Sequence, residues 1–348
     1  MVFLLGILLF SYFVHSMLYI PFIQLLYTWR FQRLKQITRD VFDKRTPIFD
    51  KFHQMKVGTP VGGGLLIIVL TTLFFPLTIF TMKYFWIPIT SVYPMVHEIK
   101  ILLFTFISFG VLGLLDDAKK TFAWKSEFFG LRVRHKFMFE IILAVIISYW
   151  LASDLKIDIF YIPFIGVIRM GWWFIPFATF VIIAFSNAFN ITDGLDGLSA
   201  GVLMIALGAF WIVSASILDT PMSIFIALWL GGILAFLYFN VYPARIFLGD
   251  VGALSFGATL AVVGLILGKA PALVIIGFVF IIEVASSTIQ LVWKKIFHKK
   301  LFAAAPFHLY LQQAGWEEPK IVMRAWILSV VFAIIGLFIA LITKYPLN

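Results

Sequence analysis

The chain has 348 residues, of which 62% are hydrophobic and only 13% are charged, and its mean hydropathy is +1.03. A soluble domain of this size does not need so much apolar surface, whereas every crossing of a bilayer takes about 20 apolar residues. The chain contains no cysteine, which excludes a disulfide framework and a thiolate metal site. The formal net charge of +10 indicates either nucleic-acid binding or membrane loops rich in lysine and arginine.

The first apolar run covers residues 2–27. It has no basic segment before it and no small-residue cleavage site after it, and it is too long for the apolar part of a signal peptide. We therefore expect a retained first membrane helix.

Nine further apolar runs follow, and together they predict an all-α polytopic membrane protein with ten transmembrane helices in one integral domain, residues 1–348. The ten predicted spans are 2–27, 61–81, 101–115, 137–152, 173–190, 199–218, 223–239, 251–268, 271–293 and 325–343. Between the fourth and fifth spans, residues 153–172 alternate weakly between apolar and polar around Pro163-Phe164. This pattern predicts a small β-hairpin at the membrane surface.

The distribution of basic residues predicts the orientation of these spans. If both termini lie outside, 21 of the 27 lysines and arginines fall in inside loops and 6 fall outside. Such an excess is typical of cytoplasmic loops. Because the basic residues are spread over several loops between spans, we also exclude nucleic acid as a partner.

With this topology, polar residues from six separate segments gather at the cytoplasmic face. Asp116 and Asp117 end the third span, the stretch from Asn187 to Asp196 ends the fifth, Asn240 ends the seventh, Asp250 begins the eighth, Lys56 precedes the second, and His308 lies in the last inside loop. This convergence is the main indication of a site.

The stretch NAFNITDGLDGLSAG, residues 187–201, carries the densest of these clusters. Asn and Asp before Gly are ordinary turn residues. A turn does not need four such residues spaced three apart, however, and residues three apart on a helix share a face. An acid held at membrane depth costs roughly 2.5–3.5 kcal/mol, which makes it a functional candidate.

Other polar residues have plainer interpretations. His308 and Lys56, taken singly, are ordinary loop residues. We interpret Glu140 and Glu283, which lie inside spans, first as hydrogen-bond partners between helices. Gln290 shares a helix face with Glu283 and fits either packing or the site.

Carboxylate oxygens without cysteine and with few histidines suit Mg²⁺, which binds one or two carboxylates together with substrate phosphates. Glycine-rich turns let backbone N–H groups approach a phosphate. These features favour phosphoryl transfer between a water-soluble nucleotide and a lipid acceptor. A transporter would instead keep its polar site near the middle of the membrane on broken helices.

Four segments carry a family resemblance: LLDDAKK, NAFNITDGLDGLSAG, FNVYPARIFLGDVGALSFG and APFHLYLQQAGWEEPKIVMRAW. In this order they resemble the bacterial phospho-N-acetylmuramoyl-pentapeptide transferases, and the resemblance covers nearly the whole chain. The wider superfamily of polyprenyl-phosphate N-acetylhexosamine-1-phosphate transferases shares the acidic motifs, but it is less similar in GTPVGGG, residues 58–64, and in the last segment.

The resemblance implies a fold with ten spans, both termini outside, and an active site at the cytoplasmic side of the inner membrane. It also implies a reaction: Mg²⁺-dependent transfer from UDP-N-acetylmuramoyl-pentapeptide (UDP-MurNAc-pentapeptide) to undecaprenyl phosphate, which gives lipid I and UMP. The resemblance also implies a homodimer, since members of the family usually form one, although nothing in this chain indicates it.

The resemblance further assigns roles to matching residues. Asp250 matches the metal-binding acid, with Asp116, Asp117 or Asp193 as further candidate ligands, and Asp116 and Asp117 match the acidic pair that contains the base for the lipid phosphate. Asp193 and His308 match other catalytic groups. The substrate-binding matches are Gly194, Leu195 and Asp196 at the uridine, Phe247 stacking on uracil, and Lys56, Asn187, Asn190, Asn240 and Gln290 as polar contacts.

The chain departs from the family pattern at two places. Only His308 remains where the family usually has three consecutive histidines, because Leu309 and Tyr310 follow it. Val61 stands where the family usually has threonine. The first departure leaves open which groups contact the diphosphate or the sugar.

Two other functions remain as alternatives. One is a transferase that moves N-acetylglucosamine 1-phosphate, or another hexosamine phosphate, to the same lipid. The other belongs to a different class, a polyprenyl-phosphate transporter or a non-catalytic lipid-binding protein. Sequence also does not separate a one-step reaction from a route through an aspartyl phosphate.

Overall fold

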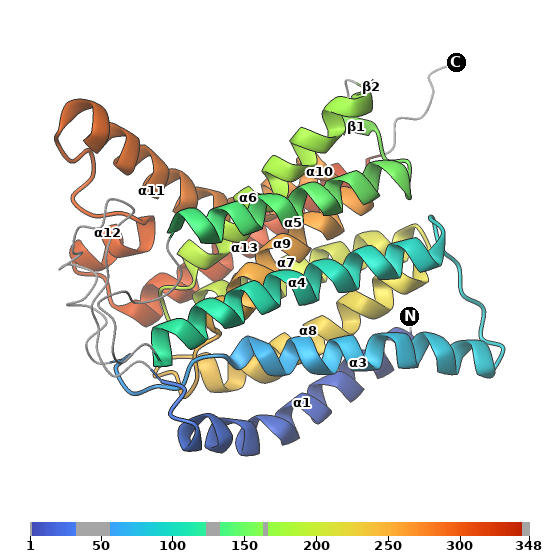
Figure 1. Ribbon diagram of the computed structural model, residues 1–348, viewed down its shortest axis with the longest axis horizontal. Coiled ribbons are helices and arrows are strands. Elements are labelled where there is room, and N and C mark those ends of the chain that lie inside the picture. The colour runs from blue at the N-terminus through green and yellow to red at the C-terminus, as the bar shows by residue number, and fades with distance from the viewer. Residues whose placement is uncertain (1, 33–55, 123–132, 163–165, 343–348) are drawn as a thin grey trace.

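The computed structural model, drawn in Figure 1, describes residues 2–32, 56–122, 133–162 and 166–342. The predicted turn at Pro163-Phe164 lies outside these residues, as do the basic residues of segments 33–55 and 123–132 that entered the charge count.

Nine helices of the described chain are long and apolar enough to cross a membrane. They are α1 (Val2–Thr28), α3 (Gly63–Tyr84), α4 (Met95–Phe122), α5 (Val133–Ser153), α6 (Phe174–Thr192), α7 (Leu198–Ser216), α8 (Thr220–Asn240), α9 (Gly249–Ile266) and α13 (Glu318–Leu341). Nine of the predicted spans are thus confirmed as helices. The helix predicted at 101–115 is longer at both ends, because its polar flanking residues continue the helix.

The ninth predicted span, 271–293, is present as a bent pair of helices, and the described chain has ten candidate spans if this pair counts as one. The chain forms α10 (Ala270–Ile276) and α11 (Phe278–Phe297), which meet at an angle of 78°. The break falls at Gly277, where an added Cβ would lie 2.5 Å from the Phe185 ring and 2.9 Å from the Leu273 carbonyl oxygen. Figure 1 shows α11 leaning away from the other helices, next to the short helix α12 (Phe307–Gln313).

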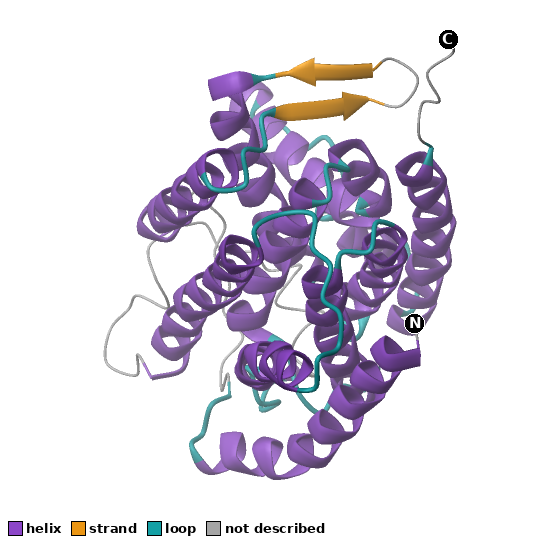
Figure 2. Ribbon diagram, turned by 90° about the vertical axis from the view of Figure 1, so that its right-hand side faces the viewer, coloured by secondary structure: helices purple, strands orange, loops and turns teal. Residues whose placement is uncertain are grey.

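The predicted hairpin is present. Strands β1 (Ile159–Ile162) and β2 (Gly166–Arg169) pair antiparallel, with Ile159 opposite Arg169, and a short 3₁₀ helix, η2 (Gly171–Trp173), leads into α6. The hairpin, the start of α1 and the end of α13 lie at one end of the helical bundle, which we call the hairpin end (Figures 1 and 2). We call the opposite end the site end.

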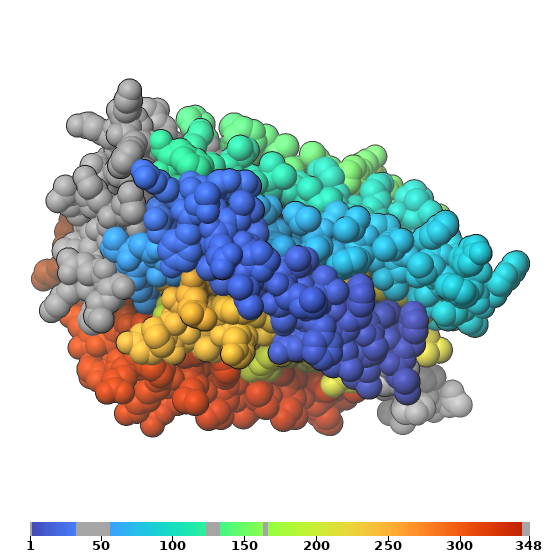
Figure 3. Space-filling model, turned by 90° about the horizontal axis from the view of Figure 1, so that it is seen from below, coloured from blue at the N-terminus to red at the C-terminus, as the bar shows by residue number. Residues whose placement is uncertain are grey.

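Helices α8 and α9 form the centre of the bundle. Every residue of α9 is buried, and α9 packs against α4, α6 and α3, while α8 packs against α1, α7 and α3. The rings of Phe106, Trp229 and Phe256 meet between α4, α8 and α9. The outer helices expose large apolar side chains, as a lipid-facing surface requires. Figure 3 shows one of them, α1, lying across α3 and α8.

Two glycines allow helices to approach closely at the site end. A Cβ at Gly113 of α4 would lie 2.1 Å from the carbonyl oxygen of Asp250, and a Cβ at Gly64 of α3 would lie 2.4 Å from the Cα of Gly252. Only glycine permits this backbone contact. As a result, the carboxyl end of α4 lies directly beside the first turn of α9.

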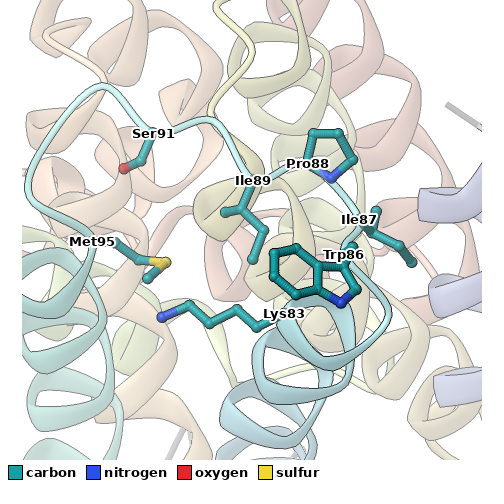
Figure 4. A pocket seen from close by; sticks show the side chains of 7 residues that line it. All are labelled: Lys83, Trp86, Ile87, Pro88, Ile89, Ser91 and Met95. Atoms are coloured by element: carbon teal, nitrogen blue, oxygen red, sulfur yellow. The ribbon is translucent and has the colours of Figure 1, made fainter.

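The hairpin end carries an open hollow of about 480 Å³ at the connection between α3 and α4 (Figure 4). It is lined by Lys83, Trp86, Ile87, Pro88, Ile89, Ser91 and Met95. None of the predicted site residues lines it.

Candidate active site

The first part of the candidate site is a cluster of two acids and two lysines where α4, α5 and α9 meet. The Lys120 ammonium lies 2.9 Å from Asp116 Oδ2 and 2.8 Å from Asp250 Oδ2. The Lys136 ammonium lies 3.2 Å and 2.6 Å from the same two oxygens. Asp116 and Asp250, which are 134 positions apart in the chain, therefore share two cations.

The second acid of the pair, Asp117, lies beside the start of α9. Its Oδ2 accepts a hydrogen bond from the backbone N–H of Val251 at 3.0 Å. A carboxylate is stabilised there by the helix dipole and by N–H groups that have no partner within the helix. Asp116, Asp117 and Asp250 thus form one group of neighbouring acids.

The two lysines of this cluster were absent from the predicted site. Lys120 stands four residues after Asp116 on the same helix, a spacing that itself indicates an ion pair. Lys136 has no comparable local signal for its pairs with Asp116 and Asp250, because both acids lie on other helices.

The second part of the site is the turn after α6, which contains Gly194, Leu195 and Asp196. The Lys56 ammonium lies 2.7 Å from Asp196 Oδ1 and donates to the Gly194 carbonyl at 3.4 Å. Asp196 Oδ2 accepts from the N–H of Ala244 at 2.9 Å. The structure thus brings together Lys56 and the residues predicted to bind uridine.

Asn240 and Phe247 border the same turn. The Asn240 side chain accepts from the Gly197 N–H at 3.0 Å and donates to the Ile246 carbonyl at 2.9 Å, so it ties the end of α8 to the turn. The Phe247 ring lies 6.0 Å from the Lys56 ammonium. Val61 is buried and pairs with Phe247 through a parallel bridge, so the residue that replaces the usual threonine packs inside the protein.

His308 lies against this turn. Its Nδ1 is 2.9 Å from Glu283 Oε2, and its backbone N–H donates to Glu283 Oε1 at 3.1 Å. Its Nε2 faces Gly194, where an added Cβ would come within 2.5 Å. Glu283 was interpreted as a partner between helices, and it is the residue of α11 that holds His308.

Leu309 and Tyr310, which replace two usual histidines, lie apart from these contacts. Leu309 is buried, and Tyr310 lines a small hollow together with Ser286, Phe302, Ala304 and Phe307.

The remaining predicted residues make local contacts. Asn187 donates to Glu140 Oε2 at 2.6 Å, which confirms Glu140 as a partner between α5 and α6. Asp193 accepts a hydrogen bond from Ser199, and Asn190 is half-buried on the last turns of α6. The Gln290 amide accepts from the N–H groups of Leu301 and Phe302 and donates to the Phe302 carbonyl, so it holds the loop after α11.

Two acids of the cluster, Asp116 and Asp250, are suited to Mg²⁺, although they do not form a complete metal site by themselves. Within the described ranges, no group of three or more His, Asp or Glu side chains is arranged to hold a metal ion. Asp116 and Asp250 nevertheless face common cations at 2.6–3.2 Å. Mg²⁺ is usually held by one or two carboxylates together with substrate phosphates, so this pair suits an ion that a diphosphate completes.

The family described as Glycosyl transferase family 4 matches residues 99–268, which run from α4 to the end of α9. A phospho-N-acetylmuramoyl-pentapeptide-transferase of Acetivibrio thermocellus is 35% identical, with 83% of each chain covered. Proteins of the same name from Borrelia turicatae and Rickettsia rickettsii are 35% and 36% identical and cover 93% and 82% of this chain. The chain therefore belongs to the family of phospho-N-acetylmuramoyl-pentapeptide transferases and is a membrane-spanning transferase enzyme.

Proposed function

We propose that this protein transfers phospho-N-acetylmuramoyl-pentapeptide from UDP-MurNAc-pentapeptide to undecaprenyl phosphate, giving lipid I and UMP, as a membrane step of peptidoglycan synthesis. The observation that carries the proposal is the acid–lysine cluster of Asp116, Asp250, Lys120 and Lys136 at the same end of the bundle as the turn that contains Asp196 (Figure 1). A nucleotide and a lipid phosphate are both anionic, and phosphoryl transfer between them depends mainly on positioning and charge.

In this proposal the two parts of the site have separate tasks. The turn of residues 194–196, with Asn240 and Phe247, holds the uridine, and the acid–lysine cluster receives the diphosphate. The ammonium groups of Lys120 and Lys136 offset phosphate charge there. Asp116 or Asp117 accepts the proton of the lipid phosphate when it is still protonated. Since the second pKa of a phosphomonoester is about 6, this base contributes modestly.

A lipid phosphate oxygen then attacks the β-phosphorus of the nucleotide, the bond to the bridging oxygen of UMP breaks, and UMP leaves. Asp250 with Asp116 would hold Mg²⁺, which would supply charge neutralisation at the diphosphate. His308, fixed through Nδ1 by Glu283, presents Nε2 toward Gly194 and thus toward the nucleotide.

The test is UMP release by purified protein with undecaprenyl phosphate and a panel of UDP-sugars, with and without Mg²⁺. We expect release with UDP-MurNAc-pentapeptide only when Mg²⁺ is present. If the protein instead turns over UDP-N-acetylglucosamine, the proposed substrate is wrong and the protein is an N-acetylglucosamine 1-phosphate transferase. Binding of the lipid without UMP release from any donor would contradict a catalytic role for this chain.

We also propose that the site end faces the cytoplasm of the bacterial inner membrane. The support is the excess of basic residues in the loops that the sequence predicts to lie inside. Because the chain has no cysteine, single cysteines at exposed positions can report sidedness directly. In intact cells, a membrane-impermeant maleimide should label Trp172→Cys at the hairpin end and leave Arg245→Cys at the site end unlabelled. The reverse pattern would overturn the orientation.

A further inference from the structure

Glu318, the first residue of α13, contacts two elements of the nucleotide end of the site. Its Oε1 lies 2.6 Å from the Lys56 ammonium and accepts a hydrogen bond from the Asp196 N–H at 2.6 Å. The side chain is only 9% exposed. Its place at the start of a helix also favours the carboxylate. Glu318 therefore joins the C-terminal helix to Lys56 and to the turn after α6.

The charges at this point do not suit a phosphate. The Lys56 ammonium has two carboxylates within 2.7 Å, those of Asp196 and Glu318, so its positive charge is more than offset locally. A phosphate placed there would meet net negative charge. Lys56 thus serves to connect Glu318 with Asp196 and to fix the turn, a task that suits binding of the uncharged uridine.

A second contact from α13 holds the same segment. The Trp326 indole N–H donates to the Gly197 carbonyl at 3.1 Å, and a Cβ on Gly201 would lie 2.0 Å from the Trp326 Nε1. Helix α13 therefore lies in direct contact with the start of α7, with no room for a side chain at Gly201. Trp326 and Glu318 bind the turn from two points, eight residues apart on one helix.

We propose that Glu318 is a positioning residue for the nucleotide end of the site, acting through Lys56 and the Asp196 N–H rather than on the reacting atoms. This inference rests on the proposed function, because it takes the 194–196 turn as the uridine-binding element. Without the Glu318 charge, Lys56 loses one of its two anionic partners and the turn loses its link to α13. The nucleotide then binds more weakly, while the acid–lysine cluster keeps its geometry.

The test compares Glu318→Gln with Glu317→Gln, a matched control because Glu317 is the exposed neighbouring acid. The KM for UDP-MurNAc-pentapeptide should rise about tenfold in Glu318→Gln, an effect of the size expected for coupled neighbours. Its kcat and its KM for undecaprenyl phosphate should stay within about threefold of wild type, as expected for loss of binding alone. The Kd for UMP, measured by calorimetry without lipid, should rise with the KM.

A double variant separates positioning from a general effect on the fold. If Glu318 acts through Lys56, Glu318→Gln should weaken nucleotide binding much less in a Lys56→Met background than in wild type. If the losses of nucleotide affinity in the two single variants simply add in the double variant, Glu318 does not act through Lys56. Should Glu318→Gln fail to fold, Glu318→Asp carries the same comparison with Glu317→Asp.

The outcomes also separate this inference from the proposed function. If wild-type protein releases no UMP from UDP-MurNAc-pentapeptide, the proposed function fails. If wild type is active and Glu318→Gln has the KM and the UMP affinity of Glu317→Gln, the function stands and the positioning role is wrong.

Discussion

Helix α4 carries acids at both ends, and the two ends of the bundle balance them differently. At the site end, Asp116 and Asp250 share the ammonium groups of Lys120 and Lys136. At the hairpin end, Glu98 of α4 and Asp219, which precedes α8, are both buried, and the two carboxyl groups interact with each other. In the described chain, no lysine or arginine forms an ion pair with either acid of this second pair.

Two neighbouring buried carboxyl groups disfavour each other's ionisation, so one of them tends to keep its proton. Burial accordingly raises the pKa of Asp219, and burial together with the charges of Asp219 and Glu98 raises the pKa of Tyr93 to about 12. Ser91 also donates to Glu98, which ties the connection between α3 and α4 to this pair. The two pairs thus differ in what offsets their charge, which is ammonium groups at the site end and protonation at the hairpin end.

The largest effect should come from Asp250→Asn, which removes the carboxylate shared by both lysines. Turnover should fall about a thousandfold or more, since charge stabilisation at the diphosphate is worth several kcal/mol. UMP release measures the loss, and thermal unfolding in detergent checks that the protein remains folded. Asp154→Asn, which changes a half-buried acid of the hairpin end that pairs with Lys100, should keep near wild-type activity. Normal turnover in Asp250→Asn would remove Asp250 from the site.

Lys136→Met should lower turnover by about a hundredfold or more, because the site loses one of the cations that stabilise charge at the diphosphate. Asp116 and Asp250 would then share one cation instead of two. Arg134→Gln is the matched control, since Arg134 is an exposed cation on the same turn of α5. If the two variants have equal activity, the cluster does not depend on Lys136.

Gly194→Ala should lower kcat/KM by about ten- to hundredfold, the range that corresponds to an overpacking cost of about 1–3 kcal/mol. The added methyl group would lie 2.5 Å from His308 Nε2, so the imidazole must leave its contact with Glu283 or the turn must move. Gly208→Ala in α7 has no atom within 4 Å of its new Cβ and should keep full activity. A fully active Gly194→Ala would show that the position of His308 against this turn is unimportant.

The smallest effect concerns the pair of Glu98 and Asp219 and is a change in the pH dependence of stability. Because the pKa of Asp219 is raised in the folded protein, its stabilising contribution is complete below its ordinary pKa of about 4 and is lost as the pH rises through the raised value. A tenfold change in the acid dissociation constant on folding corresponds to about 1.4 kcal/mol of stability.

The melting temperature of wild-type protein should therefore fall as the pH rises, and Asp219→Asn should flatten this slope while still capping α8 through Met222. Glu98→Gln should flatten it as well. An unchanged slope in both variants would show that neither carboxyl group keeps its proton in the folded protein.

Much of the fold follows from local pattern. Apolar runs located nine of the spanning helices, and alternation located the hairpin, because both signals lie within about 20 neighbouring residues. The break at Gly277 was missed because an apolar run looks the same whether it forms one helix or two. The bend instead reflects Phe185 of another helix, which lies against Gly277.

The candidate site was predictable only in part, for the same reason. Asp116, Asp117 and Asp250 were predicted to gather at one face of the membrane, and they are close in space. His308 lies against Gly194. Lys136 and Glu318 were missed because their partners lie on other helices. Gln290 carries polar atoms that suit a substrate, yet in the folded chain they bind the backbone of a neighbouring loop.

The sequence by itself determined that this chain is a helical membrane protein with acids, amides and glycines at the ends of its helices, because hydropathy and helix geometry are local properties. The tertiary structure alone decided which acids share a cation, which keep a proton, and which residue anchors Lys56. Those pairings depend on how closely the helices approach, and at Gly113 the contact is closer than any side chain would allow.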